Sequence, residues 1–385
     1  MFVQRTILPH LQKMLEKFPV ISLTGPRQSG KTTLLRHAFP SFKYFNLERP
    51  DHRQLIGEDP IGFLTTIGPG VIFDEAQNLP ELFSYIQAVS DDRNIPGQYI
   101  LSGSQSFLMN NQISQSLAGR VAVCHLLPFG LQELDNSSDV FQAIQNGFYP
   151  RLHEANITPA DFYPSYLQTY IERDIRSLKA IGDLRTFTRF LGLCAGRLGQ
   201  VLNVSSLAND AGIAVNTARS WLSLLESSFI VYLLQPYHKN FSKRIIKSPK
   251  LYFYDTGIAC SLLRINSPDS IQTHYLYGAL FENLVISEFL KQYYYQGMRP
   301  PVYYWRESNG IEIDCIIEKD NQELTAIEIK AGHTFSTDYL KALNKFPDQT
   351  ARKLLIYAGD QDSVLPAFSL LGWKNALRSG IGNII

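Results

Sequence analysis

Short apolar runs alternate with helical or polar stretches through the first third of the chain. The runs that resemble strands are residues 20–23, 43–46, 71–74, 99–102 and 121–127. Strands that alternate with helices along a chain predict a parallel sheet with helices on both faces. We therefore expect an α/β domain at the N-terminus.

The apolar spacing becomes helical in the middle of the chain. Residues 203–228 predict a short helix, a turn at Gly212 and a second helix that begins near an Asn216 cap. Two apolar strands follow, over residues 229–234 and 250–254. This order of elements resembles a winged helix.

The last third begins with a helix over residues 278–295, which is apolar around most of its circumference. The elements that follow are a strand at 302–306, a hairpin at 311–330, a helix near 339–343 and a strand at 353–358. Alternation within the hairpin puts Asp314, Glu328 and Lys330 on one side of a small sheet. That side is either a solvated face or a metal site.

Composition places the chain among soluble globular proteins. The chain has 385 residues, of which 45% are apolar and 18% charged, and this length predicts two or three domains. From the pattern we expect boundaries that give residues 1–155, 156–270 and 271–385. The net charge of +1 argues neither for nor against nucleic acid as a partner.

Cysteine usage and hydropathy predict a cytoplasmic location. The four cysteines form no C-x-x-C pair, which suits a reducing compartment and indicates neither a zinc site nor a disulfide framework. The N-terminus carries charges and a proline where a signal peptide has an apolar run. No uncharged apolar stretch reaches the length of about 18 residues that a membrane span requires.

A phosphate-binding motif follows the first predicted strand. Residues 25–32 read G-x-x-x-x-G-K-T between an apolar strand and a helical pattern. Lys31 is suited to reach the β- and γ-phosphates, and the Thr32 hydroxyl is suited to a magnesium position. The residues predicted to hold the nucleotide are Gly25, Pro26, Arg27, Gln28, Ser29, Gly30, Lys31, Thr32 and Thr33. ATP and Mg²⁺ are the cofactors that this motif predicts.

A second acidic motif supports this interpretation. The strand at 71–74 ends in Asp74 and Glu75. Asp74 suits water-mediated magnesium ligation, and Glu75 suits polarisation of the attacking water. The alternative is a solvated strand end, which the phosphate-binding motif upstream makes the weaker explanation.

Two further residues are candidates for catalysis because the strand order resembles the AAA-like branch of P-loop ATPases. In that branch the strand after the acidic motif ends in a polar sensor, and here Ser104 or Ser102 takes that place. Arg120, just before the last strand, resembles an arginine finger that acts in cis or in a homo-oligomer across a subunit boundary. A polar turn and a surface arginine are the respective alternatives.

The loop between the two strands of the winged-helix pattern is basic. Its cations are Lys239, Lys243, Arg244 and Lys247, and Arg219 lies on the outward side of the second helix. Such a loop can bind DNA phosphates, whereas the small exposed residues of the helix argue against sequence-specific readout. The alternative is that the winged helix serves as a lid or docking surface.

Polar residues of the C-terminal third form a second candidate site. Glu282 lies on the buried side of its helix, and a buried carboxylate needs a partner or a metal. The order helix, three strands, helix, strand resembles the core of restriction-endonuclease-like nucleases. Their signature is an acidic residue on the first helix, an Asp on the second strand and E-x-K on the third, and these fall here on Glu282, Asp314, Glu328 and Lys330. Carboxylates that meet across neighbouring strands can hold a second divalent ion, and Lys330 can position a water. Alternating charge on strands is common, so an inactive domain of this fold is the alternative.

Taken together, the chain resembles a broad prokaryotic family of AAA-type ATPases with a winged helix and a C-terminal domain of unknown function. The resemblance rests on GPRQSGKTTLL, VIFDEAQ, LSGSQSFLM, SLAGRVAVCHLLPF, YIERDI, YFYDTGIA, LFENLV and IEIDCII…IEIKAG. It implies an AAA-like P-loop NTPase domain, then a helical and winged-helix domain, then a small α/β domain similar to PD-(D/E)xK nucleases. It also implies ATP hydrolysis, coupled either to DNA or to protein partners through a regulatory or assembly switch with an inactive nuclease-like domain.

Overall fold

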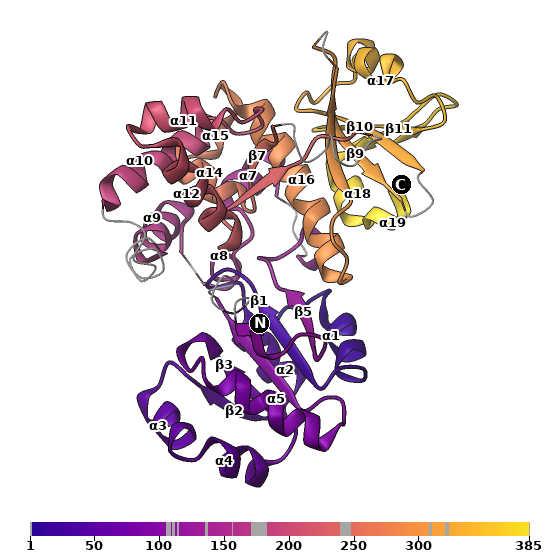
Figure 1. Cartoon of the computed structure of the whole chain (residues 1–385). Helices are drawn as coiled ribbons and strands as arrows, with labels where there is room; N and C mark the ends of the chain where they lie inside the picture. The colour runs from indigo at the N-terminus through magenta and orange to yellow at the C-terminus, as the bar shows by residue number, and fades with distance from the viewer. Residues whose placement is uncertain are drawn as a thin grey trace. The chain divides into compact units, whose positions relative to one another are not determined.

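The fold is described by a computed structural model. It covers residues 2–104, 109, 112–113, 115–134, 138–155, 157–170, 183–238, 248–307, 310–319 and 323–384. The chain divides into two compact units (Figure 1). The first unit comprises residues 1–129, 227–229 and 293–298, and the second comprises residues 130–226, 230–292 and 299–385. The subdivision of the chain at residues 155 and 270 stays a prediction.

A parallel sheet forms the centre of the first unit, as the alternating pattern predicted. Its strands are β1 (Val20–Thr24), β2 (Lys43–Asn46), β3 (Val71–Asp74), β4 (Tyr99–Gly103) and β5 (Val121–His125). They lie in the order β2-β3-β4-β1-β5, so β1 pairs with β4 on one side and with β5 on the other. Since all five strands run in the same direction, the carboxyl ends of β1, β3 and β4 lie at the same end of the sheet.

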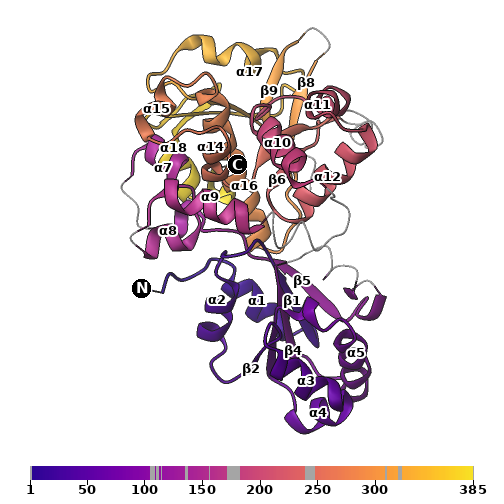
Figure 2. The same cartoon turned by 90° about the vertical axis from the view of Figure 1, so that its left-hand side faces the viewer.

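Helices cover both faces of this sheet (Figure 2). They are α1 (Leu8–Leu15), α2 (Lys31–Ala38), α3 (Pro50–Glu58), α4 (Pro60–Ile67) and α5 (Leu82–Arg93), with a short helix η1 (Ala76–Asn78) after β3. Side chains of α3, α4 and α5 share one apolar core with Phe73 and Leu101 of the sheet. Burial of both faces explains why the central strands β1, β3 and β4 begin as continuous apolar runs, whereas the edge strand β2 is partly exposed and carries polar residues.

The second unit contains a helical part and a short hairpin. Its helices before the second sheet are α7 (Val140–Asn146), α8 (Pro150–Glu154), α9 (Pro159–Tyr170), α10 (Leu184–Ala195), α11 (Val204–Ala211), α12 (Val215–Ser227), α14 (Thr256–Leu262), α15 (Pro268–Gln272) and α16 (Tyr277–Tyr295), of which the last residue of α12 and the last three of α16 belong to the first unit. Strands β6 (Val231–Leu234) and β7 (Lys250–Phe253) pair antiparallel, and Val201 forms a bridge with Lys250. The cap predicted at Asn216 is wrong, because α12 already includes Val215.

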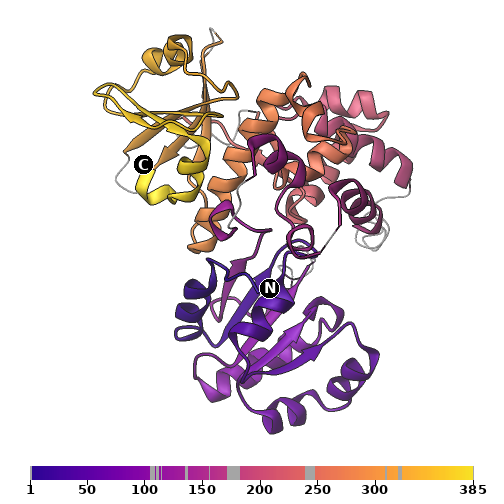
Figure 3. The ribbon, with the colours of Figure 1, turned by 180° about the vertical axis from the view of Figure 1, so that it is seen from behind.

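A mixed six-stranded sheet completes the second unit. Its strands are β8 (Val302–Arg306), β9 (Glu312–Glu318), β10 (Leu324–Lys330), β11 (Arg352–Tyr357), β12 (Ser363–Val364) and β13 (Ser369–Gly372), in the order β12-β13-β11-β10-β9-β8. The helical segments are η2 (Leu131–Glu133), η4 (Thr337–Leu340), α17 (Lys341–Lys345), α18 (Trp373–Arg378) and α19 (Ile381–Ile384). Helix α17 lies on one side of this sheet, and α18 and α19 lie on the other (Figure 3). None of the helices within the described residues is long and apolar enough to cross a bilayer.

Candidate functional site

The phosphate loop connects strand β1 to helix α2. Gly30, which precedes α2, has a φ of 93°, in the left-handed region that favours glycine. A Cβ on Gly25 would lie 2.0 Å from the carbonyl oxygen of Leu126, so a side chain does not fit there. Gly25 therefore lets the loop pack against Leu126, and Gly30 allows the turn that leads the loop into the N-terminus of α2, where phosphates bind.

Lys31 is buried at the start of α2. Its Nζ donates to the carbonyl oxygens of Gly25 and Pro26, both at 2.8 Å, which holds the ammonium against the loop. The hydroxyl of Ser29 is buried and has no hydrogen-bond partner among the described residues. A buried ammonium and an unpaired hydroxyl in one loop fit a polyphosphate ligand. The predicted loop residues that are exposed or half-buried are Arg27, Gln28, Gly30, Thr32 and Thr33.

Asp74 is the centre of a hydrogen-bonded cluster and is only 2% exposed. Its Oδ2 accepts from the hydroxyls of Thr32 at 2.6 Å and Tyr44 at 2.7 Å. Its Oδ1 accepts from the hydroxyl of Ser102 at 2.5 Å. The Thr32 and Asp74 oxygens are hard donors side by side, which fits the two protein positions of a Mg²⁺ site that also uses phosphate oxygens.

Tyr44 is a site residue that the sequence analysis missed. Its strand β2 lies beside β3, so Asn46 is the register partner of Asp74 and Tyr44 lies two residues earlier. Burial and the hydrogen bond to Asp74 raise the pKa of the Tyr44 hydroxyl. A tyrosine on a predicted strand was the only signal available, because strand adjacency is a property of the folded sheet.

Glu75 follows Asp74 in a left-handed conformation, with a φ of 53°. Its Oε2 accepts three hydrogen bonds: from the amide of Gln77 at 2.6 Å, from the Ser104 hydroxyl at 3.1 Å and from the Ser104 backbone N–H at 3.3 Å. The structure therefore brings the predicted base and the predicted sensor together. Gln77 was missed by the sequence analysis, although its place two residues after the carboxylate was a usable signal.

Arg120 lies at the amino end of the parallel strands, whereas the phosphate loop lies at their carboxyl end. It precedes β5, and its carbonyl accepts from the backbone N–H of Val20, the first residue of β1. Its guanidinium pairs at 2.5 Å with Asp91, and both side chains are more than one-third exposed. This position argues against an arginine finger that acts in cis, because parallel strands begin at the end of the sheet remote from the loop, and a role of Arg120 across a subunit boundary stays a prediction.

A second polar cluster lies in the second unit, where the acid predicted on the long helix meets the β6–β7 hairpin. Glu282 of α16 accepts through Oε1 from Lys250 Nζ at 3.1 Å and from the Tyr252 hydroxyl at 2.5 Å. Lys250 also pairs with Glu312 and is only 2% exposed. Lys250 and Tyr252 were missed, since nothing in the strand pattern marks a lysine as buried.

Asp314, Glu328 and Lys330 meet on neighbouring strands β9 and β10. Lys330 Nζ lies 2.5 Å from Glu328 Oε1 and 3.6 Å from Asp314 Oδ2. Asp314 Oδ2 also accepts from the backbone N–H of Ile329 at 2.9 Å. The three side chains that were predicted to share one side of the hairpin thus form an ion-pair cluster.

Burial dominates the electrostatics of this cluster. It raises the pKa of Glu282 to about 7 and that of Glu328 to about 8, and the charge of Asp314 adds to both shifts. Burial lowers the pKa of Lys250, but Glu282 and the neighbouring acids outweigh it, so the net pKa is raised. Lys330 behaves in the same way, with Asp314 as the largest opposing cause.

The second divalent ion expected at this cluster does not fit the residues as they are arranged. Lys250 contacts the carboxylates of Glu282 and Glu312, and Lys330 contacts Glu328 and lies near Asp314. Across the described ranges, no group of three or more His, Cys, Asp or Glu side chains is placed to hold a metal ion. Two ammonium groups thus take the place that a cation would occupy.

Of the residues predicted to contact DNA, the structure describes only Arg219, which is exposed on α12. Lys239, Lys243, Arg244 and Lys247 lie outside the described residues. On the same helix, Ala218, Trp221, Leu222 and Leu225 are buried, as expected for its inner face. Arg219 is therefore available to a partner.

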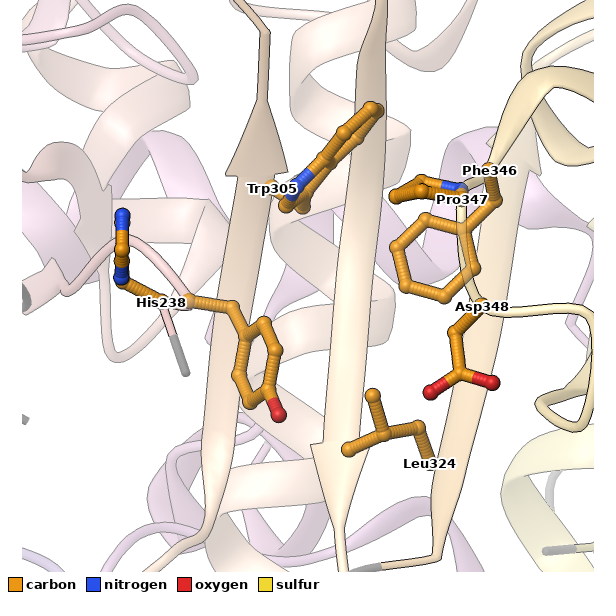
Figure 4. A pocket seen from close by; sticks show the side chains of 7 residues that line it. His238, Trp305, Leu324, Phe346, Pro347 and Asp348 are labelled. Carbon is orange, nitrogen blue, oxygen red and sulfur yellow. The ribbon is translucent and has the colours of Figure 1, made fainter. Parts of the chain in front are cut away.

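An apolar cavity of about 270 Å³ lies on the α17 side of the second sheet (Figure 4). Trp305 and Phe346 pack edge to face in its wall, with ring centroids 5.3 Å apart and nearly perpendicular planes. The lining residues are Tyr237, His238, Trp305, Leu324, Phe346, Pro347 and Asp348. None of the predicted site residues lines it, so this cavity has no part in the carboxylate chemistry.

Three protein-family models match successive parts of the chain. Residues 17–135 match a family described as an AAA domain. Residues 137–269 and 277–373 match two families described only as domains of unknown function, DUF8612 and DUF4143. The prediction of an AAA-type P-loop domain at the N-terminus is thus confirmed, whereas the families of the other two regions indicate no activity.

Uncharacterized proteins of bacteria and archaea are similar to nearly the whole chain. Protein Rv2008c of Mycobacterium tuberculosis is 30% identical over 361 residues, which are 93% of this chain and 80% of that protein. The same values hold for Mb2031c of Mycobacterium bovis. Protein MJ1544 of Methanocaldococcus jannaschii is 22% identical over 360 residues, with 83% of this chain and 77% of that protein covered.

Similarity to solved structures is weaker. The Walker-type ATPase PABY2304 of Pyrococcus abyssi is 16% identical with a TM-score of 0.44, covering 68% of this chain and 96% of that chain. A DNA replication initiation factor is 15% identical with a TM-score of 0.26, covering 55% of this chain and 69% of that chain. Family membership therefore rests on the sequence relatives and the domain matches.

Proposed function

Because the chain belongs to the family of these two mycobacterial proteins and begins with an AAA-type P-loop domain, we propose that it is a Mg²⁺-dependent ATPase. The observation that carries this proposal is the hydrogen bond between Thr32 and Asp74, beside the buried Lys31 and the held Glu75. Oxygen donors, a phosphate-binding ammonium and a carboxylate base in one place are the parts that phosphoryl transfer to water requires.

Each of these residues has a separate role. Lys31 exchanges its loop carbonyls for the β- and γ-phosphates of ATP, while Thr32 and Asp74 hold Mg²⁺ in place. Bound Mg²⁺ supplies charge neutralisation on the phosphate oxygens. Glu75 accepts a proton from the attacking water, and Ser104 keeps the Glu75 carboxylate turned toward the end of strand β4.

The test separates binding from hydrolysis. Lys31→Ala removes the ammonium and should abolish binding of a fluorescent ATP analogue, whereas Glu75→Gln should bind it and lower kcat by about 10²- to 10⁴-fold, the usual contribution of a general base. Lys13→Ala, at an exposed position of α1, is the matched control. Wild-type turnover in both active-site variants would refute the proposal.

Downstream of hydrolysis, we propose that the nucleotide state controls contact with DNA. The arrangement of α10, α11 and α12 before the β6–β7 hairpin, with Arg219 exposed, supports a winged helix, and the intervening segment is basic. Filter binding of short duplexes over a salt series measures the number of phosphate contacts. A steep salt slope that decreases when the four basic residues of segment 239–247 become alanine supports DNA binding, and a flat slope would refute it.

A second candidate function is an ATP-driven switch on protein partners, with a nuclease-like domain that does not cleave. The specific observation in its favour is that Lys250 and Lys330 form ion pairs with the carboxylates that a catalytic metal would use. On this proposal, plasmid DNA stays intact with Mg²⁺ or Mn²⁺ and ATP. Cleavage that disappears in both Asp314→Ala and Lys330→Ala would instead establish an ATP-gated nuclease.

A further inference from the structure

Gln77 has a geometry that the ATPase assignment leaves unexplained. It lies in the short helix after β3, is 8% exposed, and points its amide at Glu75. The Glu75 carboxylate can only accept, so the amide nitrogen must face it and the amide oxygen must point elsewhere. That oxygen, Oε1, is buried and has no hydrogen-bond partner among the described residues.

The position of this unpaired oxygen is built into the fold. It lies at the end of strand β4, where a Cβ on Gly103 would come within 2.3 Å of it. Gly103 has no positive φ, so backbone conformation does not require glycine there. The absence of a side chain at residue 103 therefore serves to admit the Gln77 amide.

The group that the Gln77 amide holds is the Glu75 carboxylate. All three donors from Gln77 and Ser104 converge on Oε2 of Glu75. No described residue donates to its Oε1, so one oxygen is anchored and the other is available as a base. The side chain that holds this base thus carries a buried acceptor of its own, and a water molecule, with two donors, can supply one hydrogen bond to it and one proton to Glu75.

We infer that Gln77 is a positioning residue for hydrolysis, which orients Glu75 through its amide N–H and accepts a hydrogen bond from the reacting water through Oε1. This inference rests on the proposed ATPase function. The oxygen of the water bonds to the γ-phosphorus while the Glu75 carboxylate takes one of the water's protons. The bond between the γ-phosphorus and the β–γ bridging oxygen breaks, and ADP leaves with the electron pair of that bond. Gln77 exchanges no proton and restricts the orientation of the water.

The test compares ground-state and transition-state binding in the full chain. Gln77→Ala should bind an N-methylanthraniloyl ATP analogue within about twofold of wild type. It should lose about 10- to 100-fold in kcat and in affinity for ADP with aluminium fluoride and Mg²⁺, because only the transition state uses an oriented water. Gln77→Asn keeps the amide but shortens its reach, and it should show the same pattern with little risk to folding.

Two further variants sharpen the result. Gly103→Ala removes no functional group but displaces the Gln77 oxygen, so it should reproduce the loss of aluminium-fluoride affinity. Gln54→Ala is the matched control, because Gln54 is exposed and makes the same kind of amide–carboxylate bond, to Glu58 at 3.2 Å.

The possible failures are distinguishable. If wild type hydrolyses ATP and the Gln77 variants keep its kcat and its aluminium-fluoride affinity, the inference on Gln77 is overturned and the ATPase proposal stands. If wild type binds ATP without hydrolysing it, both are overturned. Equal loss of affinity for both nucleotide probes in Gln77→Asn would show a structural role and also overturn the inference.

Discussion

Replacement of Lys250 by methionine should destabilise the second unit in a pH-dependent way. Lys250 is buried against Glu282 and Glu312, and methionine keeps the length of the side chain while removing its charge. Loss of one partner of a buried ion pair costs about 3–5 kcal/mol, because the other charge stays buried without compensation. We expect that loss at pH 8.5, where Glu282 is ionised in wild type.

The sign of the pH dependence follows from the pKa of Glu282. Burial raises it from 4.5 to about 7 in the folded protein, so between these values the folded state binds more protons than the unfolded state. Stability from this group is therefore greatest below pH 4.5 and falls as pH rises to 7, by about 3 kcal/mol at about 1.4 kcal/mol per pKa unit. Without the charge of Lys250, the pKa of Glu282 rises further. At pH 5.5 Glu282 is neutral and does not need the ammonium as a partner, so the free energy of unfolding of the variant should fall by only about 1–2 kcal/mol.

Tryptophan fluorescence in urea provides the assay. All three tryptophans, Trp221, Trp305 and Trp373, lie in the second unit, so their emission reports on that unit alone. Lys341→Met is the matched control, because Lys341 is 74% exposed and pairs with Asp338 on the surface. The control should change stability by less than about 1 kcal/mol. A Lys250→Met loss below about 1 kcal/mol at pH 8.5, or one equal at both pH values, would refute the reasoning.

Two further predictions concern the first unit. Tyr44→Phe removes one of the hydroxyl donors to Asp74 and should lower kcat about 10-fold at limiting Mg²⁺, with normal kcat at high Mg²⁺; a Mg²⁺ titration of hydrolysis checks this, and an unchanged titration contradicts it. Arg120→Ala should leave the melting temperature unchanged, because water screens the exposed ion pair with Asp91 and such pairs contribute little to stability. If Arg120 acts across a subunit boundary, the variant loses about 10³-fold in kcat, and mixing it with Glu75→Gln restores part of the activity; full activity of Arg120→Ala alone would exclude that role.

The sequence was most informative where function depends on neighbours along the chain. The phosphate loop joins a strand to a helix within residues 20–38, and the Asp74–Glu75 pair ends one strand, so both could be recognised from spacing alone. The alternation of strands and helices likewise predicted the parallel sheet, because both faces of such a sheet are buried and its strands are apolar throughout.

Contacts between distant segments were decided by the tertiary structure. Tyr44 reaches Asp74 because β2 lies beside β3, and Lys250 enters the cluster of Glu282 and Glu312 from a separate hairpin. Neither pairing leaves a periodic signal, since periodicity records which face of an element is buried and carries no information about what buries it.

Strand direction decided the remaining cases. From the sequence, Arg120 was equally suited to an active site and to a surface. The parallel sheet places it before β5, at the end of the strands remote from the phosphate loop. Gln77 and Gly103 became a pair only when the end of β4 met the helix after β3. The sequence by itself determined the chemical groups and the local turns that present them. The fold determined which groups form ion pairs and hydrogen bonds with one another, because those interactions depend on distances of a few ångströms between segments far apart in the chain.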